Sequence, residues 1–181
     1  MDKITPEINF PDELSAQFEL AGQVILIPGG YGGYGGYGSI GEVFSWGLAL
    51  SGATVVVAGR NRSSAEKLVD DLQHHALLAS ALELDVCSTA AVRQAVDRVV
   101  EEHGRIDTLV NCIGIQREEP LLEVTEEAFD EVLAVNLKSA MFLGQAVARH
   151  QVKQESGRQV HLLSVRAQLG IRDRGYSALL Q

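Results

Sequence analysis

The sequence has 181 residues, of which 46% are hydrophobic and 22% charged, and its formal net charge is −9. The length suits one ordinary domain with its own core, and the composition is typical of a globular protein. The acidic balance disfavours nucleic acid as a partner, because nucleic-acid binders usually carry a basic face. No apolar run approaches the ~20 residues of a membrane span, so we expect neither a signal peptide nor a membrane partner.

The cysteines and the N-terminus give two further expectations. Cys87 and Cys112 show neither CxxC spacing nor a nearby pair of histidines, so a disulfide framework has little support and we predict no metal site. A reduced, cytoplasmic setting follows as the default. Residues 1–17 are expected to form an N-terminal extension, and residues 18–181 the single domain.

Short runs rich in β-branched residues alternate with helical patterns along the chain. The runs predict buried parallel strands over 23–27, 54–58, 81–85, 107–112 and 159–164. An alternating strand–helix series is typical of an α/β fold with a doubly wound parallel sheet and right-handed crossovers.

Helices are expected between these strands, where apolar residues recur at helical spacing. Ser63 or Ser64 is a candidate N-cap for the second helix and Ser88 for the third, and a long helix is expected to start after Thr125. The apolar positions of the first three helices are Val43, Phe44, Gly47 and Leu48, then Ala65, Leu68, Val69 and Leu72, then Val92, Ala95, Val96 and Val99.

The first strand leads into the glycine-rich stretch "PGGYGGYGGYGSIGE", residues 28–42. The first four strands start at 23, 54, 81 and 107, which gives spacings of 31, 27 and 26 residues, so the first unit is too long. Removing two Tyr-Gly-Gly triplets would shorten it to 25 residues. We interpret the excess as an insertion placed ahead of a turn that resumes at Tyr37.

Gly35-x-x-Gly38-x-x-Gly41 follows a strand and precedes a helix, where glycines let backbone N–H groups approach a pyrophosphate. Ser39 and Ile40 complete the predicted dinucleotide-binding turn. The longer loop costs only ~0.5 kcal/mol of closure entropy, so we expect the sheet to form and cofactor binding to be weakened. The alternative, a flexible loop produced by triplet slippage, can hold at the same time. Stacking of the repeat's tyrosines on nucleic-acid bases is disfavoured by the acidic charge.

Five further motifs follow the turn in the order and spacing of one enzyme family. Together with the turn, they resemble the short-chain dehydrogenase/reductase family from about Phe18 to the end of the chain. The resemblance implies a Rossmann-like sheet with strand order 3-2-1-4-5, lacking the family's last strands. Within this family, the chain most resembles the sugar-acid and acyl-carrier ketoreductase branches. The motifs are "AGR" at 58–60, "LDV" at 84–86, "NCIG" at 111–114, "VNLKS" at 135–139 and "LLSV" at 162–165.

The resemblance implies a cofactor site along the strand ends. Arg60 and Asn61 follow the second strand, where an acidic residue would bind the ribose of NAD(H), whereas a guanidinium suits a 2′-phosphate. NADP(H) is therefore favoured over NAD(H), although Arg60 could also be a solvated loop cation. Asp85 resembles the aspartate that contacts adenine, with Val86 beside the ring; the alternative for Asp85 is an acid at a helix start.

Asn111 and Gly114 match the family motif "NNAG", but Cys112 and Ile113 replace its two central residues. Asn111 and Gly114 are therefore assigned to the cofactor site. The replacements leave the contacts of the central pair open.

Asn136 and Ser164 are the predicted catalytic residues. Asn136 falls on an apolar helical stripe, so its carboxamide needs partners and is either structural or part of a site. The resemblance implies that it supports a proton relay through water. It also implies that Ser164 steadies the substrate oxygen, whereas a serine at a strand end is otherwise a cap or turn residue. The expected stripe is Phe129, Leu133, Asn136, Ala140 and Val147.

The family's Tyr-x-x-x-Lys pair is absent from the sequence. Tyr176 lies 12 residues after Ser164, but Leu180 stands where the lysine is expected. A tyrosine with a pKa near ~10 and no neighbouring cation is a poor acid–base group at neutral pH. We therefore expect a C-terminally shortened oxidoreductase, impaired in hydride transfer between NADP(H) and a carbonyl or secondary alcohol of a small polar substrate.

Two alternatives from other classes remain open at this point. One is a non-catalytic nucleotide-binding or interaction module, and the other is a truncated product without a function. A shortened fold would leave apolar faces uncovered, so association into a homo-oligomer is possible in each case.

Overall fold

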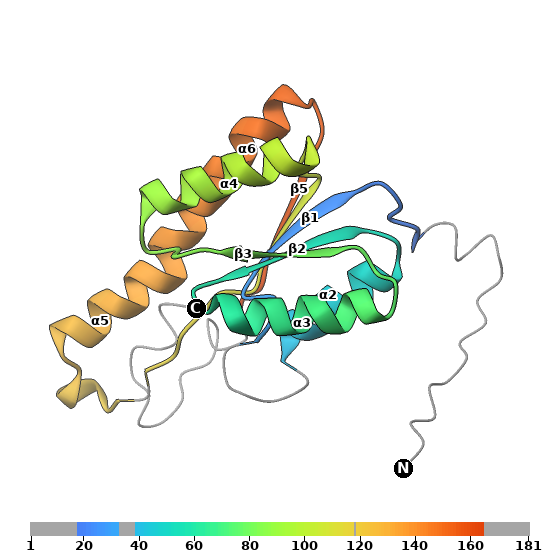
Figure 1. Cartoon of the computed structure of the whole chain (residues 1–181). Coiled ribbons are helices and arrows are strands. Elements are labelled where there is room, and N and C mark those ends of the chain that lie inside the picture. Colours follow the sequence, from blue (N-terminus) through green and yellow to red (C-terminus); the bar gives the residue numbers. More distant parts are fainter. Residues whose placement is uncertain (1–17, 33–38, 118, 165–181) are drawn as a thin grey trace, which may run out of the picture.

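The computed structural model of the chain describes residues 18–32, 39–117 and 119–164. In this part, a parallel five-stranded sheet lies between two layers of helices (Figure 1). The strand order β3-β2-β1-β4-β5 confirms the predicted doubly wound α/β fold. The predicted N-terminal extension, residues 1–17, lies outside the described residues.

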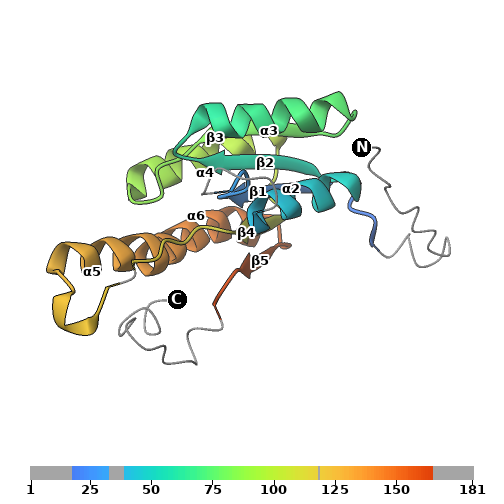
Figure 2. The same ribbon diagram turned by 90° about the horizontal axis from the view of Figure 1, so that it is seen from below.

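The sheet is built around β1, which is buried along its whole length because it pairs with β2 on one side and β4 on the other. Strands β3 and β5 are at its two edges, and Figure 2 shows β5 on the side opposite β3. The strands are β1 (Val24–Pro28), β2 (Thr54–Gly59), β3 (Ala79–Glu83), β4 (Thr108–Asn111) and β5 (Arg158–His161).

Two predicted strands were wrong at their ends. The third was expected at 81–85, but its ladder with β2 starts at Ala79 and ends at Glu83, opposite Gly59. The fifth was expected to reach Ser164, yet it ends at His161 because its only partner among the described strands, β4, ends there too. Strand length is thus set by the partner strand, which hydrophobic patterning does not report.

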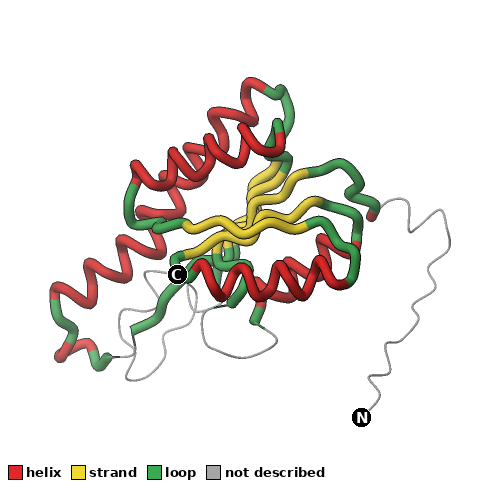
Figure 3. The backbone as a smooth tube through the Cα atoms, viewed as in Figure 1, coloured by secondary structure: helices red, strands yellow, loops and turns green. Residues whose placement is uncertain are grey.

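Helices cover both faces of the sheet (Figure 3). Alternate side chains of β1 pack into two separate cores, one on each face of the sheet. Leu26 belongs to the core under α4 and α6, and Ile25 and Ile27 belong to the core under α2 and α3. The helices are α2 (Ile40–Leu50), α3 (Arg62–His74), α4 (Thr89–His103), α5 (Glu126–Val132) and α6 (Ser139–Lys153), with a short helical turn at Leu121–Glu123.

Side-chain caps fix where the helices begin. Ser88 and Thr125 each accept the backbone N–H three residues further on, which confirms the predicted starts of α4 and α5. Ser63 and Ser64 were the wrong caps for α3. Asn61 is its N-cap, because Asn61 has extended backbone and its side chain accepts the N–H of Ser64 at 3.0 Å.

The long helix expected after Thr125 contains a π-helical segment, Leu133–Lys138, between α5 and α6. A π turn adds one residue per turn and shifts the phase of the buried stripe. Phe129, expected on the buried stripe, is 38% exposed, so that part of the stripe was wrong. The buried residues of this region are Val132, Val135, Ser139, Leu143, Ala146, Val147 and Gln151.

Candidate functional site

A cleft of about 450 Å³ opens at the carboxyl ends of the central strands. It lies where the chain order reverses on the two sides of β1, the usual ligand position in open α/β sheets. Each neighbouring segment contributes to its lining: Gly29 follows β1, Arg60 follows β2, Val86 follows β3 and Gly114 follows β4.

Gly29, which lines the cleft at the end of β1, is in close contact with the first turn of α2. Gly29 has a φ of +77°, and a Cβ added to Gly41 would lie 2.1 Å from the carbonyl oxygen of Gly29. Ser39 is the N-cap of α2, and its hydroxyl accepts the N–H of Glu42 at 3.3 Å. The N-terminus of α2 therefore lies against a residue that lines the cleft, with glycine required on both sides of the contact.

Gly29 and its neighbour Gly30 were not predicted from the sequence. A Cβ at Gly30 would lie 2.8 Å from the hydroxyl of Ser45, which is buried and donates to the carbonyl of Gly30 at 2.9 Å. The available signal was their position, directly after a strand. The predicted Gly35 and Gly38 lie outside the described residues. Ser39 caps α2 and Ile40 and Gly41 are its first residues, and their contact with cofactor stays a prediction.

The described chain on the two sides of residues 33–38 comes together. A Cβ added to Gly32, which has a φ of +81°, would lie 2.1 Å from the hydroxyl oxygen of Ser39. Gly32 and Ser39, which flank the long loop recognised from the strand spacing, therefore lie in contact with each other.

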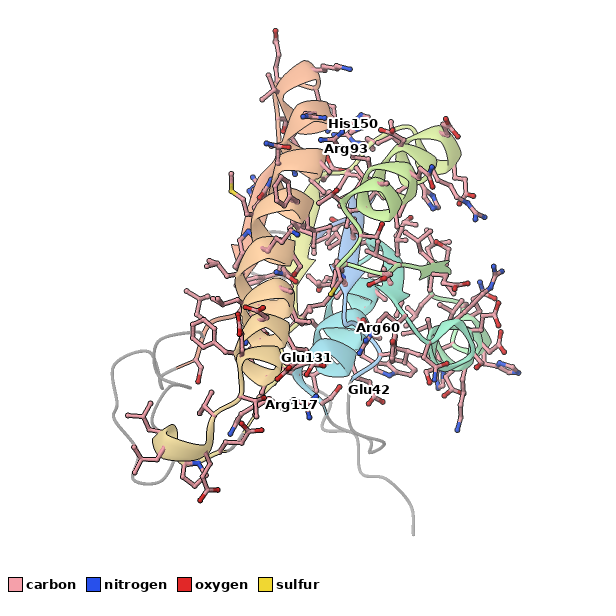
Figure 4. The ribbon with its side chains drawn as sticks, turned by 90° about the vertical axis from the view of Figure 1, so that its left-hand side faces the viewer. Glu42, Arg60, Arg93, Arg117, Glu131 and His150 are labelled. Carbon is pink, nitrogen blue, oxygen red and sulfur yellow. The ribbon has the colours of Figure 1, made fainter. Side chains whose placement is uncertain are left out.

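The β2 side of the cleft carries Arg60 and Asn61. Arg60 is exposed and lines the cleft (Figure 4), and its guanidinium pairs with no carboxylate among the described residues. The side chain of Asn61 is engaged in capping α3, and its backbone N–H donates to the hydroxyl of Tyr31 at 3.1 Å. Tyr31, a residue of the repeat, also lines the cleft, a position that the sequence analysis missed.

Asp85 and Val86 take different places after β3. Val86 is buried in the cleft wall, whereas Asp85 is exposed and its carboxylate accepts the N–H of Cys87 at 3.0 Å. That bond shapes the turn leading to the Ser88 cap, which matches the structural alternative considered for Asp85. Contact between Asp85 and adenine stays a prediction.

The segment after β4 is held by Asn111. This side chain is buried, its oxygen accepts the N–H of Ile113 at 3.2 Å, and its nitrogen lies 3.4 Å from Nδ1 of His161. Cys112 also lines the cleft, and burial raises the pKa of its thiol to about 11. The thiol is thus neutral at physiological pH, and this wall of the cleft carries no negative charge from it.

Asn136 satisfies its carboxamide by bonding one backbone unit twice. Its oxygen accepts the N–H of Ile115 at 2.8 Å, and its nitrogen donates to the carbonyl of Ile115 at 2.9 Å. These bonds tie the π-helical segment to the cleft wall at Gly114 and Ile115. Ser164 is half-buried three residues beyond β5 and does not line the described cleft.

Metal-ligand clusters and membrane-spanning helices are both absent from the described part of the chain. Residues 18–32, 39–117 and 119–164 contain no group of three His, Cys, Asp or Glu side chains that could hold a metal ion. Within these ranges no helix has the length and hydropathy needed to cross a bilayer.

Similarity to known proteins agrees with this geometry. The family model "short chain dehydrogenase" matches residues 23–178. The chain is 37% identical to the gluconate 5-dehydrogenase of Gluconobacter oxydans over 68% of this chain and 48% of that protein. It is 33% identical to the 5-keto-D-gluconate 5-reductase of Escherichia coli K12 over 84% of this chain and 58% of that protein.

Solved structures give the same picture. The crystal structure of a gluconate 5-dehydrogenase from Burkholderia cenocepacia, in complex with NADP and tartrate, has 32% identity and a TM-score of 0.84, covering 92% of this chain and 63% of that one. The chain thus spans about half the length of the curated relatives it matches. The sheet order, the cleft and the match over residues 23–178 show that the chain belongs to the short-chain dehydrogenase family, a lineage of NAD(P)-dependent oxidoreductases.

Proposed function

We propose that the cleft binds NADP(H) as part of an oxidoreductase that acts on a carbonyl or secondary alcohol of a sugar acid. The observation that carries the cofactor choice is Arg60, an exposed guanidinium at the cleft with no carboxylate partner among the described residues. A carboxylate after β2 would bind the ribose hydroxyls of NAD(H), whereas a guanidinium pairs with a 2′-phosphate. The NADP complex of the Burkholderia relative supports the same choice.

The cleft fits the other parts of a dinucleotide. Because Gly29 and Gly41 lack side chains, the positive end of α2 lies against the cleft at Gly29, and we propose that the pyrophosphate binds beside this point. Leu84, Val86 and Ile113 form an apolar wall suited to the flat rings. When bound, the cofactor would supply or accept the hydride of the reaction.

The catalytic roles assigned to Asn136 and Ser164 belong to this proposal. Asn136 is a positioning residue in the structure, because its carboxamide holds Ile115 and joins the cleft wall to the π-helical segment. We propose that this segment orders a proton relay through water and that Ser164 orients the substrate oxygen. The sugar-acid substrate is supported by the names of the relatives, a gluconate dehydrogenase and a ketogluconate reductase.

The 181-residue polypeptide is proposed to bind cofactor and to turn it over slowly, because its sequence holds no Tyr-x-x-x-Lys pair. The same observation favours a second candidate, a nucleotide-binding module without catalysis. NADPH oxidation with 5-keto-D-gluconate separates the two: slow, substrate-dependent turnover supports the impaired enzyme, and binding without any turnover supports the module. Robust turnover would contradict both.

Self-association is also proposed, on the basis of apolar side chains left exposed on the α5–α6 side. Leu137 is 63% exposed and Met141 is 62% exposed. Large exposed apolar groups commonly mark association surfaces. Gel filtration with light scattering should give a mass above that of one 19.5 kDa chain. A monomer at all concentrations would contradict this.

The cofactor assignment is tested by a matched pair of arginine variants. Arg60→Gln removes the guanidinium at the cleft, and Arg62→Gln removes a neighbouring exposed guanidinium that pairs with Glu66 outside the cleft. Calorimetry should show that Arg60→Gln weakens NADPH binding about tenfold, or 1.4 kcal/mol, and leaves NADH binding unchanged. Arg62→Gln should change neither. Equal effects of both substitutions, or an equal loss of NADH and NADPH binding, would overturn the assignment.

A further inference from the structure

Tyr31 occupies the β2 end of the cleft in the structure. Its ring lies over Gly59, where an added Cβ would fall 2.4 Å from a ring carbon and 2.5 Å from the phenol oxygen. The same oxygen accepts the backbone N–H of Asn61 at 3.1 Å. Tyr31, Gly59 and Arg60 all line the cleft, so the phenol ring fills space beside the guanidinium assigned to the 2′-phosphate.

This end of the cleft is where the adenosine ribose of a dinucleotide is recognised, because the segment directly after the second strand contacts the 2′-substituent in this fold. The N–H of Asn61 is a donor suited to a 2′-oxygen, and the phenol oxygen already takes it. A ring and a ribose cannot share the space over Gly59. On the basis of the proposed function, we infer that Tyr31 competes with the adenosine ribose for the β2 end of the cleft and thereby lowers the affinity for the cofactor.

The surroundings of Tyr31 allow the ring to leave. The residue stands between Gly30 and Gly32, it is only half-buried, and one hydrogen bond holds its hydroxyl. Displacing the ring therefore sacrifices one neutral hydrogen bond and part of an apolar contact. Cofactor binding must include this displacement, so the apparent affinity of the adenosine half falls while the affinity at the other end of the cleft, near Ile115 and Val135, stays the same.

Two variants of Tyr31 separate the ring from its hydroxyl. Tyr31→Phe keeps the ring and frees the N–H of Asn61, whereas Tyr31→Ala removes both obstacles. Calorimetric titration with 2′,5′-ADP should show affinity about threefold higher for Tyr31→Phe, which loses one neutral hydrogen bond, and about tenfold higher for Tyr31→Ala, with the same order for NADPH. Nicotinamide mononucleotide should bind all forms equally. Phe129→Ala, on exposed α5, is the control for loss of an aromatic ring and should change nothing.

The outcomes distinguish this inference from the proposed function. If the wild type and both Tyr31 variants bind 2′,5′-ADP and NADPH, and the variants bind equally or more weakly than the wild type, the competition is refuted and the cofactor assignment stands. If no form binds either ligand, both fail. Circular dichroism checks folding; should Tyr31→Ala not fold, Tyr31→Phe decides alone, because it retains the ring and its packing.

Discussion

Gly41→Ala tests the contact between Gly29, which lines the cleft at the end of β1, and the first turn of α2. The added Cβ would lie 2.1 Å from the carbonyl oxygen of Gly29 and 3.0 Å from its carbonyl carbon, well inside the ~3.5 Å at which non-bonded heavy atoms attract. Both obstacles are backbone, so the start of α2 or the end of β1 must move. Overpacking of this kind costs about 1–3 kcal/mol, more than the ~1 kcal/mol that alanine gains over glycine within a helix.

Gly47→Ala in the same helix is the matched control. A Cβ at Gly47 meets nothing within 4 Å, so only the helix propensity acts and stability should rise by about 0.5–1 kcal/mol. Urea unfolding followed by circular dichroism measures both changes. Gly41→Ala should also weaken NADPH binding, since the backbone that faces the pyrophosphate is displaced. If Gly41→Ala were as stable as Gly47→Ala, the close contact between β1 and α2 would be refuted.

Three further outcomes are expected. Burial raises the Cys112 pKa to about 11, so the folded thiol stays protonated after the unfolded thiol has ionised, and stability falls as pH rises from about 9 to about 11. The urea midpoint of Cys112→Ala should fall less over this range. An equal fall in the midpoints of Cys112→Ala and the wild type would contradict the raised pKa. Asp107→Ala should cost about 1–3 kcal/mol in urea unfolding, since it leaves the buried N–H of Val24 without the carboxylate that accepts it at 2.8 Å; an unchanged midpoint would show that the bond contributes nothing. Asn136→Ala loses both bonds to Ile115 and should cost about 1–3 kcal/mol, whereas wild-type stability would mean that the cleft wall is held by other contacts.

The layers of the fold were predictable because buried parallel strands and amphipathic helices leave strong periodic signals. Strand order followed from the family resemblance, and the long first unit was recognised from spacing alone. Strand ends were not predictable: those of β3 and β5 depend on neighbouring strands, as the pairing of Asn111 with His161 shows. The π-helical segment around Asn136 was also missed, because one extra residue in a turn changes the burial phase without changing the composition.

Site residues could be proposed from the sequence where the side chain's own charge or polarity suggests a role. They could not be proposed where the role depends on which residues the fold brings next to them. Arg60 was assigned from its charge after a strand, and the structure places it at the cleft. Tyr31 was grouped with the other tyrosines of the repeat, since nothing in the triplet distinguishes the one that reaches Gly59. Gly41 was predicted to bind the cofactor and stays a prediction; its partner Gly29 precedes the repeat and is known only from the contact.

Because Gly32 and Ser39 lie against each other, the number of Tyr-Gly-Gly triplets between them does not determine where β1 and α2 lie. Chain that leaves and re-enters at adjoining points moves neither end, and each doubling of such a loop costs only ~0.6 kcal/mol of closure entropy. A Tyr-Gly-Gly triplet corresponds to nine nucleotides, so its gain or loss by replication slippage preserves the reading frame. The number of triplets can therefore change while β1 and α2 keep their positions, and the fold places no strict limit on the length of this segment.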